Sequence, residues 1–183
     1  PVDVAEHCAD VTATVIDAAS QGLEVVRLVS GDPFLDGDIG AEAAAVARAD
    51  HDVDVVPGVT GMTAVPEYAG LILHGHDVQL IGDAACQRDI AGHGSNWSDQ
   101  GLIVVNTEAG KLKEVVKHAI ESGRGEDEPA ALICHGATTQ QTTHTVTLGE
   151  LPQTAKTARL GDAEPVHVAI GKVVEAPERE QLD

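Results

Sequence analysis

The chain has 183 residues, enough for one large domain or two small ones, and 43% of them are hydrophobic. Thirty acidic against eleven basic residues give a formal net charge of −19, which argues against binding to nucleic acid or to an anionic membrane surface. The three cysteines (Cys8, Cys86 and Cys134) form no C-x-x-C pair, which disfavours a disulfide framework and a zinc site and fits a reducing compartment, the cytoplasm.

No apolar run approaches the ~18 residues of a transmembrane helix, and no signal peptide is recognisable. The chain begins at Pro1 without Met, which is typical of a processed or truncated piece.

The first part of the chain alternates predicted helices and strands. Residues 2–21 repeat apolar side chains at spacings of three and four, which predicts a helix. Residues 23–29 are mostly large and apolar, as in a strand buried on both faces. A second helix is predicted over 39–49, a short strand over 52–56 and a third helix over 60–69.

The second part continues the alternation. A helix is predicted over residues 111–122, where apolar side chains form one stripe, and residues 82–101 are polar enough to be a loop. Strands are expected over residues 78–81, 102–106, 130–134, 144–148 and 166–170. Strands alternating with helices favour an α/β architecture.

Two of the predicted strands run straight into tight loops. The first loop is Ser30-Gly31-Asp32-Pro33, and the second is Pro57-Gly58-Val59-Thr60-Gly61. A glycine allows the backbone to approach a ligand closely, and a proline fixes φ. In an open α/β sheet, the loops at the carboxyl ends of the strands are where ligands bind. The sequence therefore predicts a ligand site at these loops.

Together with Glu42, Ala64 and the run Tyr68-Ala69-Gly70-Leu71, these loops resemble the tetrapyrrole methylases. Within that family the chain is most similar to the uroporphyrinogen-III C-methyltransferases, in their actinobacterial fused form. The resemblance implies two αβα units with a cofactor cleft between them. Residues 1–72 would be the remainder of an N-terminally truncated first unit, and residues 73–183 the second unit.

The resemblance also implies S-adenosylmethionine as the cofactor, held largely by the backbone of loops. Carried over residue by residue, the implied cofactor contacts are Ser30, Gly31, Asp32, Leu35, Thr60, Gly61, Asn106 and Gly136. Each has a plainer interpretation that stays open. A glycine can simply form a turn, Asp32 and Thr60 can cap helices, and Asn106 can be a polar residue at a strand end. His135, next to Gly136, is interpreted as structural or solvated.

The chain departs from the family pattern in three places. The family opens with a strand and a Gly-x-Gly-Pro-Gly-Asp-Pro loop; nothing like it occurs here. The family's proposed catalytic acid and base lie in that opening, so the catalytic residues of this chain stay unknown. The family's Arg residues are also missing from the segments 37–42 and 72–76, although a substrate with eight carboxylates would favour them.

The resemblance implies methyl transfer to uroporphyrinogen III, in sirohaem and cobalamin synthesis, and leaves open whether these residues alone are active. Two alternatives stay open: another precorrin methyltransferase, and a non-catalytic module with the same fold. Implied partners are the tetrapyrrole, a second copy in a homodimer, and a uroporphyrinogen-III synthase domain fused in the parent protein. A metal site at His74 and His76, with Asp77 and His93 as further candidates, is the least supported idea because zinc needs about four ligands.

Overall fold

The computed structural model describes residues 10–36, 39–82 and 97–175. By their contacts they divide into two compact units, Pro1–Thr60 and Gly61–Asp183. This division by contact differs from the domain boundary after residue 72 that the family resemblance implies. The boundary after residue 72 stays a prediction.

The unit Gly61–Asp183 is built on a five-stranded sheet in the order β1-β2-β5-β3-β4. β1 and β2 are parallel, and every other neighbouring pair is antiparallel. The strands are β1 Val78–Ile81, β2 Leu102–Glu108, β3 Pro129–Cys134, β4 Thr142–Thr147 and β5 Pro165–Ile170. All five lie where the sequence predicts strands, which confirms the α/β class.

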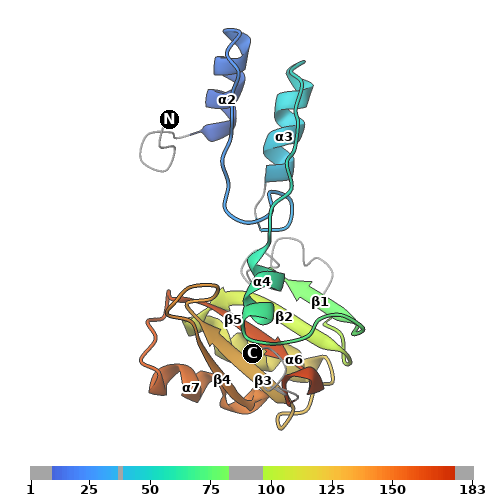
Figure 1. Cartoon of the computed structure of the whole chain (residues 1–183), viewed down its shortest axis with the longest axis vertical. Coiled ribbons are helices and arrows are strands. Elements are labelled where there is room, and N and C mark those ends of the chain that lie inside the picture. Colours follow the sequence, from blue (N-terminus) through green and yellow to red (C-terminus); the bar gives the residue numbers. More distant parts are fainter. Residues whose placement is uncertain (1–9, 37–38, 83–96, 176–183) are drawn as a thin grey trace. The chain divides into compact units, whose positions relative to one another are not determined.

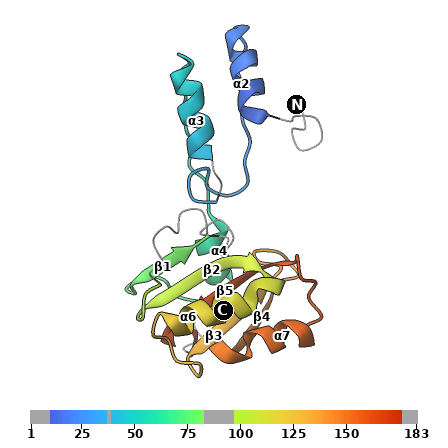
Figure 2. The same cartoon turned by 180° about the vertical axis from the view of Figure 1, so that it is seen from behind.

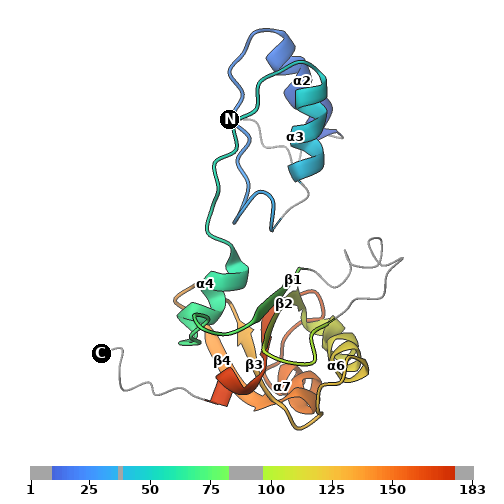
Figure 3. The same cartoon turned by 90° about the vertical axis from the view of Figure 1, so that its right-hand side faces the viewer.

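Helices cover both faces of this sheet (Figure 1 and Figure 3). Helix α4 (Gly61–Tyr68) lies on one face, and α6 (Leu112–Glu121) and α7 (Leu151–Thr157) lie on the other, the face turned to the viewer in Figure 2. The part of this unit that the structure describes also contains three 3-10 turns: η1 Ala109–Lys111, η2 Leu148–Glu150 and η3 Lys172–Glu175. Within the described ranges, no helix is long and apolar enough to cross a membrane.

Successive side chains of β2 point to opposite faces of the sheet and enter two hydrophobic cores, one on each face. Ile103 and Val105 are fully buried in the core on the side of α6 and α7. Leu102 and Val104 are fully buried in the other core, together with Val65 of α4. Successive side chains of a strand point to opposite faces, so a run that is apolar throughout is suited to a strand covered on both sides.

A buried guanidinium fastens the loop before β2. Arg124 donates hydrogen bonds to the carbonyl oxygens of Ser98, Gln100 and Gly101 and to Glu128 Oε1. The guanidinium is charged and fully enclosed, and these acceptors satisfy its donors. Arg124 therefore positions the start of β2, the strand that carries Asn106 at its far end.

The described residues of the unit Pro1–Thr60 contain two helices in contact with each other, α2 (Val11–Ser20) and α3 (Ile39–Arg48) (Figure 1). α2 begins where the Asp10 carboxylate accepts a hydrogen bond from the Ala13 N–H, an N-cap interaction. The helix predicted over 39–49 is confirmed as α3. The helix predicted over 2–21 is confirmed from Val11 onward, and residues 1–9 lie outside the described part of the chain.

The strands predicted over residues 23–29 and 52–56 are wrong for this structure. Both segments lack strand structure, and no backbone hydrogen bond joins one to the other within the described residues. Val26, Leu28 and Val56 are 76%, 81% and 81% exposed. A strand exists only when a neighbour satisfies its backbone groups. The apolar pattern indicates that these segments would favour burial. In the described residues, no partner strand covers them.

Candidate functional site

The loops 30–36 and 57–60 lie against each other in the first unit. Gly31 has φ +71°, and a Cβ added there would lie 2.1 Å from Asp36 Oδ2. A Cβ added at Gly58 would lie 2.1 Å from the Gly31 carbonyl oxygen. Both positions therefore require glycine, Gly31 for its positive φ and for space, and Gly58 because backbone meets backbone.

Two carboxylates join these loops. Asp32 Oδ1 accepts from the N–H groups of Phe34 and Leu35 at 3.0 and 3.1 Å, and Asp32 Oδ2 accepts from the Gly58 N–H at 3.2 Å. Asp36 Oδ2 accepts from the Asp32 N–H at 2.7 Å, and Asp36 Oδ1 accepts from the Thr60 hydroxyl at 2.6 Å. The carboxylate of Asp32 thus caps a turn and fastens the second loop, which agrees with its plainer interpretation as a cap.

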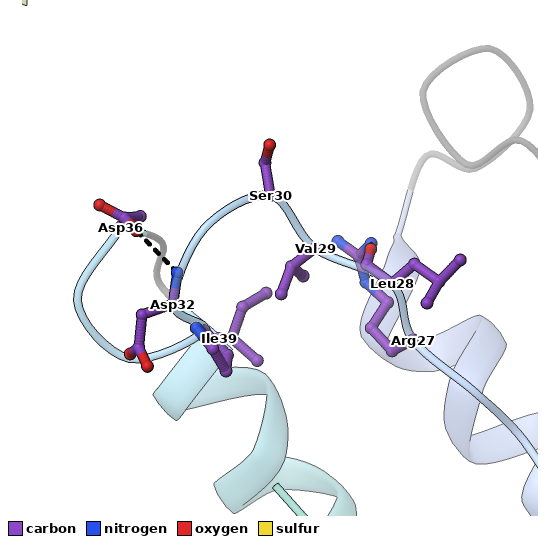
Figure 4. Close-up of a pocket in the computed structure, with 8 residues that line it drawn as sticks. Arg27, Leu28, Val29, Ser30, Asp32, Asp36 and Ile39 are labelled. Atoms are coloured by element: carbon purple, nitrogen blue, oxygen red, sulfur yellow. Dashed lines mark hydrogen bonds between the residues drawn. The ribbon is translucent and has the colours of Figure 1, made fainter. Parts of the chain in front are cut away.

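A cavity of about 310 Å³ opens beside the first loop (Figure 4). Arg27 lines this cavity and forms an ion pair with Glu42 of α3, with Nε 3.3 Å from Oε1. Ser30 is exposed, and its hydroxyl points away from the loop in Figure 4. The cavity is lined by Arg27, Leu28, Val29, Ser30, Asp32, Pro33, Asp36 and Ile39.

In the second unit, the turn after β3 is pressed against α4. A Cβ added at Gly136 would lie 2.5 Å from both methyl carbons of Val65, so no larger residue fits. His135 and Ala137, on either side, have φ of +51° and +55°, the left-handed region that costs non-glycine residues energy. The Ala137 N–H donates to Gln141 Oε1 at 2.7 Å, which helps to hold the turn.

Asn106 lies at the end of β2 directly opposite His167 of β5. By strand alternation, both side chains project to the face that α4 covers, as Val104 and Ala169 do. Gly61, the first residue of α4, would place a Cβ 3.3 Å from His167 Nε2. Gly61, Asn106 and His167 therefore gather at the beginning of α4.

A cavity of about 420 Å³ is bordered by His167 and by the turn after β3. His135 and Glu164 lie beside it, with Nε2 3.4 Å from Oε1. Cys134, the last residue of β3, leads into the turn. Burial raises the pKa of its thiol, and the thiol is therefore neutral at physiological pH. The cavity is lined by His135, Gly136, Thr138, Thr139, Gln140, Pro165 and His167.

The predicted site residues fall into two groups, one in each unit. Ser30, Gly31, Asp32, Leu35 and Thr60 belong to the first, and Gly61, Asn106 and Gly136 belong to the second. Their contact with a cofactor stays a prediction. Sequence reasoning missed two residues, Asp36 and His167. The only available signal for Asp36 was its place four residues after Asp32 in a glycine turn; nothing in the spacing pointed to His167.

The candidate metal ligands do not form a cluster in the part of the chain that the structure describes. There, no three or more His, Cys, Asp or Glu side chains come together in a way that could hold a metal ion. His74 and His76 are both exposed, and His93 lies outside the described residues.

The comparisons with known proteins agree with the sequence resemblance. A model of the family "Tetrapyrrole (Corrin/Porphyrin) Methylases" matches residues 2–152. Siroheme synthase 1 of Serratia proteamaculans is 34% identical over 169 residues, which cover 88% of this chain and 34% of that protein. Siroheme synthase of Chromobacterium violaceum is 30% identical over 175 residues, or 93% of this chain and 37% of that protein. The chain thus spans about a third of the length of the curated relatives it matches.

Solved structures show the same fold. Uroporphyrin-III-C-methyltransferase of Thermus thermophilus superposes with a TM-score of 0.71 at 26% identity, covering 90% of this chain and 71% of that one. A cobalt precorrin-4 methyltransferase also gives 0.71, at 23% identity, covering 93% and 73%. A complex of the Thermus protein with S-adenosylhomocysteine, the demethylated form of the family's methyl donor, gives 0.66 at 22% identity and covers 90% and 73%. From the family match over most of its length, we conclude that the chain belongs to the tetrapyrrole (corrin/porphyrin) methylases.

Proposed function

We propose that this chain is an S-adenosylmethionine-dependent C-methyltransferase that acts on uroporphyrinogen III, in sirohaem and cobalamin biosynthesis. The family match over residues 2–152 carries the proposal. The kinship with siroheme synthases supports the choice of substrate, since sequence identity to these relatives reaches 34%.

The loops support a role in binding the cofactor. S-adenosylmethionine supplies an electrophilic methyl group, and the protein has to orient the cofactor and exclude water. The cavities of about 310 and 420 Å³ are of the size typical of small-molecule sites. Glycine backbone borders the larger cavity at Gly136, and Gly31 adjoins the smaller one, so the residues present fit a ligand held by main-chain groups.

We assign the cofactor contacts to Ser30, Gly31, Leu35, Thr60, Gly61, Asn106 and Gly136. Asp32 acts through its neighbours: because its carboxylate holds the N–H groups of Leu35 and Gly58, it is a positioning residue for both loops. Of these residues, Gly61, Asn106 and Gly136 belong to the second unit. The catalytic acid and base are not assigned.

Methyl transfer can be tested with S-adenosylmethionine labelled at the methyl group. Incubation with enzymatically prepared uroporphyrinogen III, kept free of oxygen, should move the label into the tetrapyrrole fraction. The Gly136→Val variant should lose this transfer, because its side chain would overlap Val65 and displace the turn. A Gly161→Val control, at a site with open space around the glycine, should retain it. Transfer by the Gly136→Val variant at the wild-type rate would contradict the assignment.

A second candidate is methylation of a different precorrin. The segment Ile72–His76 favours it, because His74 and His76 stand exposed where the family carries an Arg for the substrate carboxylates. An imidazole lacks the planar fork of donors with which a guanidinium binds a carboxylate. Competition between uroporphyrinogen III and a panel of precorrins in the same assay separates the two: preferential labelling of a precorrin would favour this candidate.

The wider setting of the activity is part of the same proposal. We place the family's domain boundary after residue 72, the protein in the cytoplasm, and a uroporphyrinogen-III synthase domain on the parent chain. A non-catalytic role remains the third candidate, and the exposed segments 23–29 and 52–56 favour it. Failure of the chain to bind S-adenosylhomocysteine would move that role to first place.

A further inference from the structure

The turn after β3 holds two residues in a costly backbone conformation. His135 and Ala137 both have positive φ, on either side of Gly136, which is pressed against Val65 of α4. Residues other than glycine persist in this conformation only where their surroundings hold them there. The turn also borders the cavity of about 420 Å³. The contacts that hold the turn therefore fix the shape of this cavity.

Two hydrogen bonds that hold the turn come from the turn itself. The Thr138 hydroxyl donates to the His135 carbonyl oxygen at 2.6 Å, and the Ala137 N–H donates to Gln141 Oε1 at 2.7 Å. Residues 135–141 are exposed or half-buried, so water competes for these groups and each bond contributes little. Residues 135–141 also contain no Asp, Glu, Lys or Arg, so a charged partner has to come from another segment.

Glu164, in the loop before β5, is a carboxylate whose position is fixed by several hydrogen bonds. Its Oε2 accepts the Gly161 N–H at 3.0 Å, within the same loop. Its carbonyl oxygen accepts the Ala109 N–H at 2.9 Å, and the Asp162 carbonyl oxygen accepts the Gly110 N–H at 2.9 Å. These bonds attach the loop to η1, which directly follows β2. The Glu164 side chain therefore stands on a well-anchored segment.

His135 connects the strained turn to this carboxylate. Its Nε2 lies 3.4 Å from Glu164 Oε1, and an imidazole nitrogen that carries a proton is attracted to a carboxylate in the neutral ring as in the charged one. One wall of the cavity is the turn itself, and the other is the beginning of β5, with Pro165 and His167. The contact thus joins the weakly held wall to the segment that leads into the other wall.

We propose that His135 and Glu164 form a bridging pair that keeps the turn in the shape that binds the cofactor. The inference rests on the proposed function, which assigns Gly136 to cofactor binding. Both members are positioning residues, since neither is assigned a contact with the reacting atoms. A wall that is already ordered lowers the cost of binding, so the pair lowers the KM for the methyl donor and leaves kcat unchanged. Because the pair is partly exposed, its effect is about 3-fold.

Titration calorimetry with S-adenosylhomocysteine tests the bridging pair in a double-mutant cycle. His135→Asn shortens the side chain but keeps a residue that tolerates positive φ, and Glu164→Gln removes the charge but keeps an acceptor for the Gly161 N–H. Each variant should raise Kd about 3-fold, and the double variant should bind no more weakly than either, because both substitutions break one contact. In the methyl-transfer assay, KM should rise by the same factor at unchanged kcat. The control His144→Asn, on β4 and outside the lining of this cavity, should bind like wild type.

Amide hydrogen exchange of the ligand-free chain provides a readout that needs no cofactor. The Ala137 N–H should exchange about 3-fold faster in His135→Asn and in Glu164→Gln than in wild type or His144→Asn. Unchanged exchange in both variants, wild-type affinity in both, or effects that add up in the double variant would overturn the bridging pair alone. No binding by the wild-type chain is a separate result, which would overturn the proposed function and the effect on cofactor affinity with it.

Discussion

Replacing Asp32 by Ala should release the two loops of the first unit from each other. The substitution removes three acceptor contacts to backbone N–H groups, those of Phe34, Leu35 and Gly58. A hydrogen bond to a charged group contributes up to about 3 kcal/mol, and partial exposure reduces this to about 1 kcal/mol each. Only the Gly58 contact joins the two loops, so they should separate about 5-fold more often, a cost of about 1 kcal/mol.

Amide hydrogen exchange at Gly58 measures this opening directly. Its N–H is held only by the Asp32 carboxylate within the described part of the chain, at 3.2 Å. In the Asp32→Ala variant, Gly58 should exchange about 5-fold faster, while amides of the five-stranded sheet keep their wild-type rates. Asp54→Ala is the matched control, because Asp54 is an exposed carboxylate of the same unit. Unchanged exchange at Gly58 in the Asp32→Ala variant would refute the account of the loops.

Three further predictions concern stability. Arg124→Met should cost about 3–5 kcal/mol in urea unfolding, because Glu128 and three carbonyl groups lose their buried partner. Lys117→Met, in an exposed pair with Glu121, should cost under about 1 kcal/mol, and equal losses would contradict this contrast. The Thr147 backbone N–H and hydroxyl lower the pKa of Glu150, so its stabilising effect is present at neutral pH and is lost as pH falls through that lowered pKa. Melting curves should accordingly separate Glu150→Gln from wild type at pH 7 and converge in acid; a constant difference would be inconsistent with this linkage. Finally, raising NaCl from about 0.1 to 2 M should raise the melting temperature by screening the net charge of −19, and a flat or falling response would argue against self-repulsion.

The sequence was sufficient to predict the sheet of the second unit. Leu102–Glu108 and Pro165–Ile170 are apolar runs with both faces covered, so their own residues specify their burial. Helix α6 was equally clear, with Leu112, Val115 and Ala119 buried on one stripe. Helix α7 was missed because it is short and has a Pro near its beginning. A Pro in the first turn is nevertheless compatible with a helix, because the N–H that it lacks would have no partner within the helix there.

The first unit shows the limit of the same reasoning. Its two apolar segments, residues 23–29 and 52–56, have the composition of strands. A strand forms only when a second segment hydrogen-bonds to it, and composition does not identify that second segment. The site was predictable where glycine is required by backbone geometry, as at Gly31 and Gly58. Asp36 and His167 were not predictable, because their importance arises from contacts with Thr60 and Gly61, which only the folded chain brings near them.

The central claim is that the loops at Asp32 and Gly58 form part of a cofactor site. Titration calorimetry with S-adenosylhomocysteine tests it most directly. We predict that the wild-type chain and Asp54→Ala bind one equivalent with similar affinity. Asp32→Ala should bind several-fold more weakly, because a smaller fraction of its molecules has the loops in the binding-competent arrangement. No binding by the wild-type chain, or equal binding by Asp32→Ala, would contradict the claim.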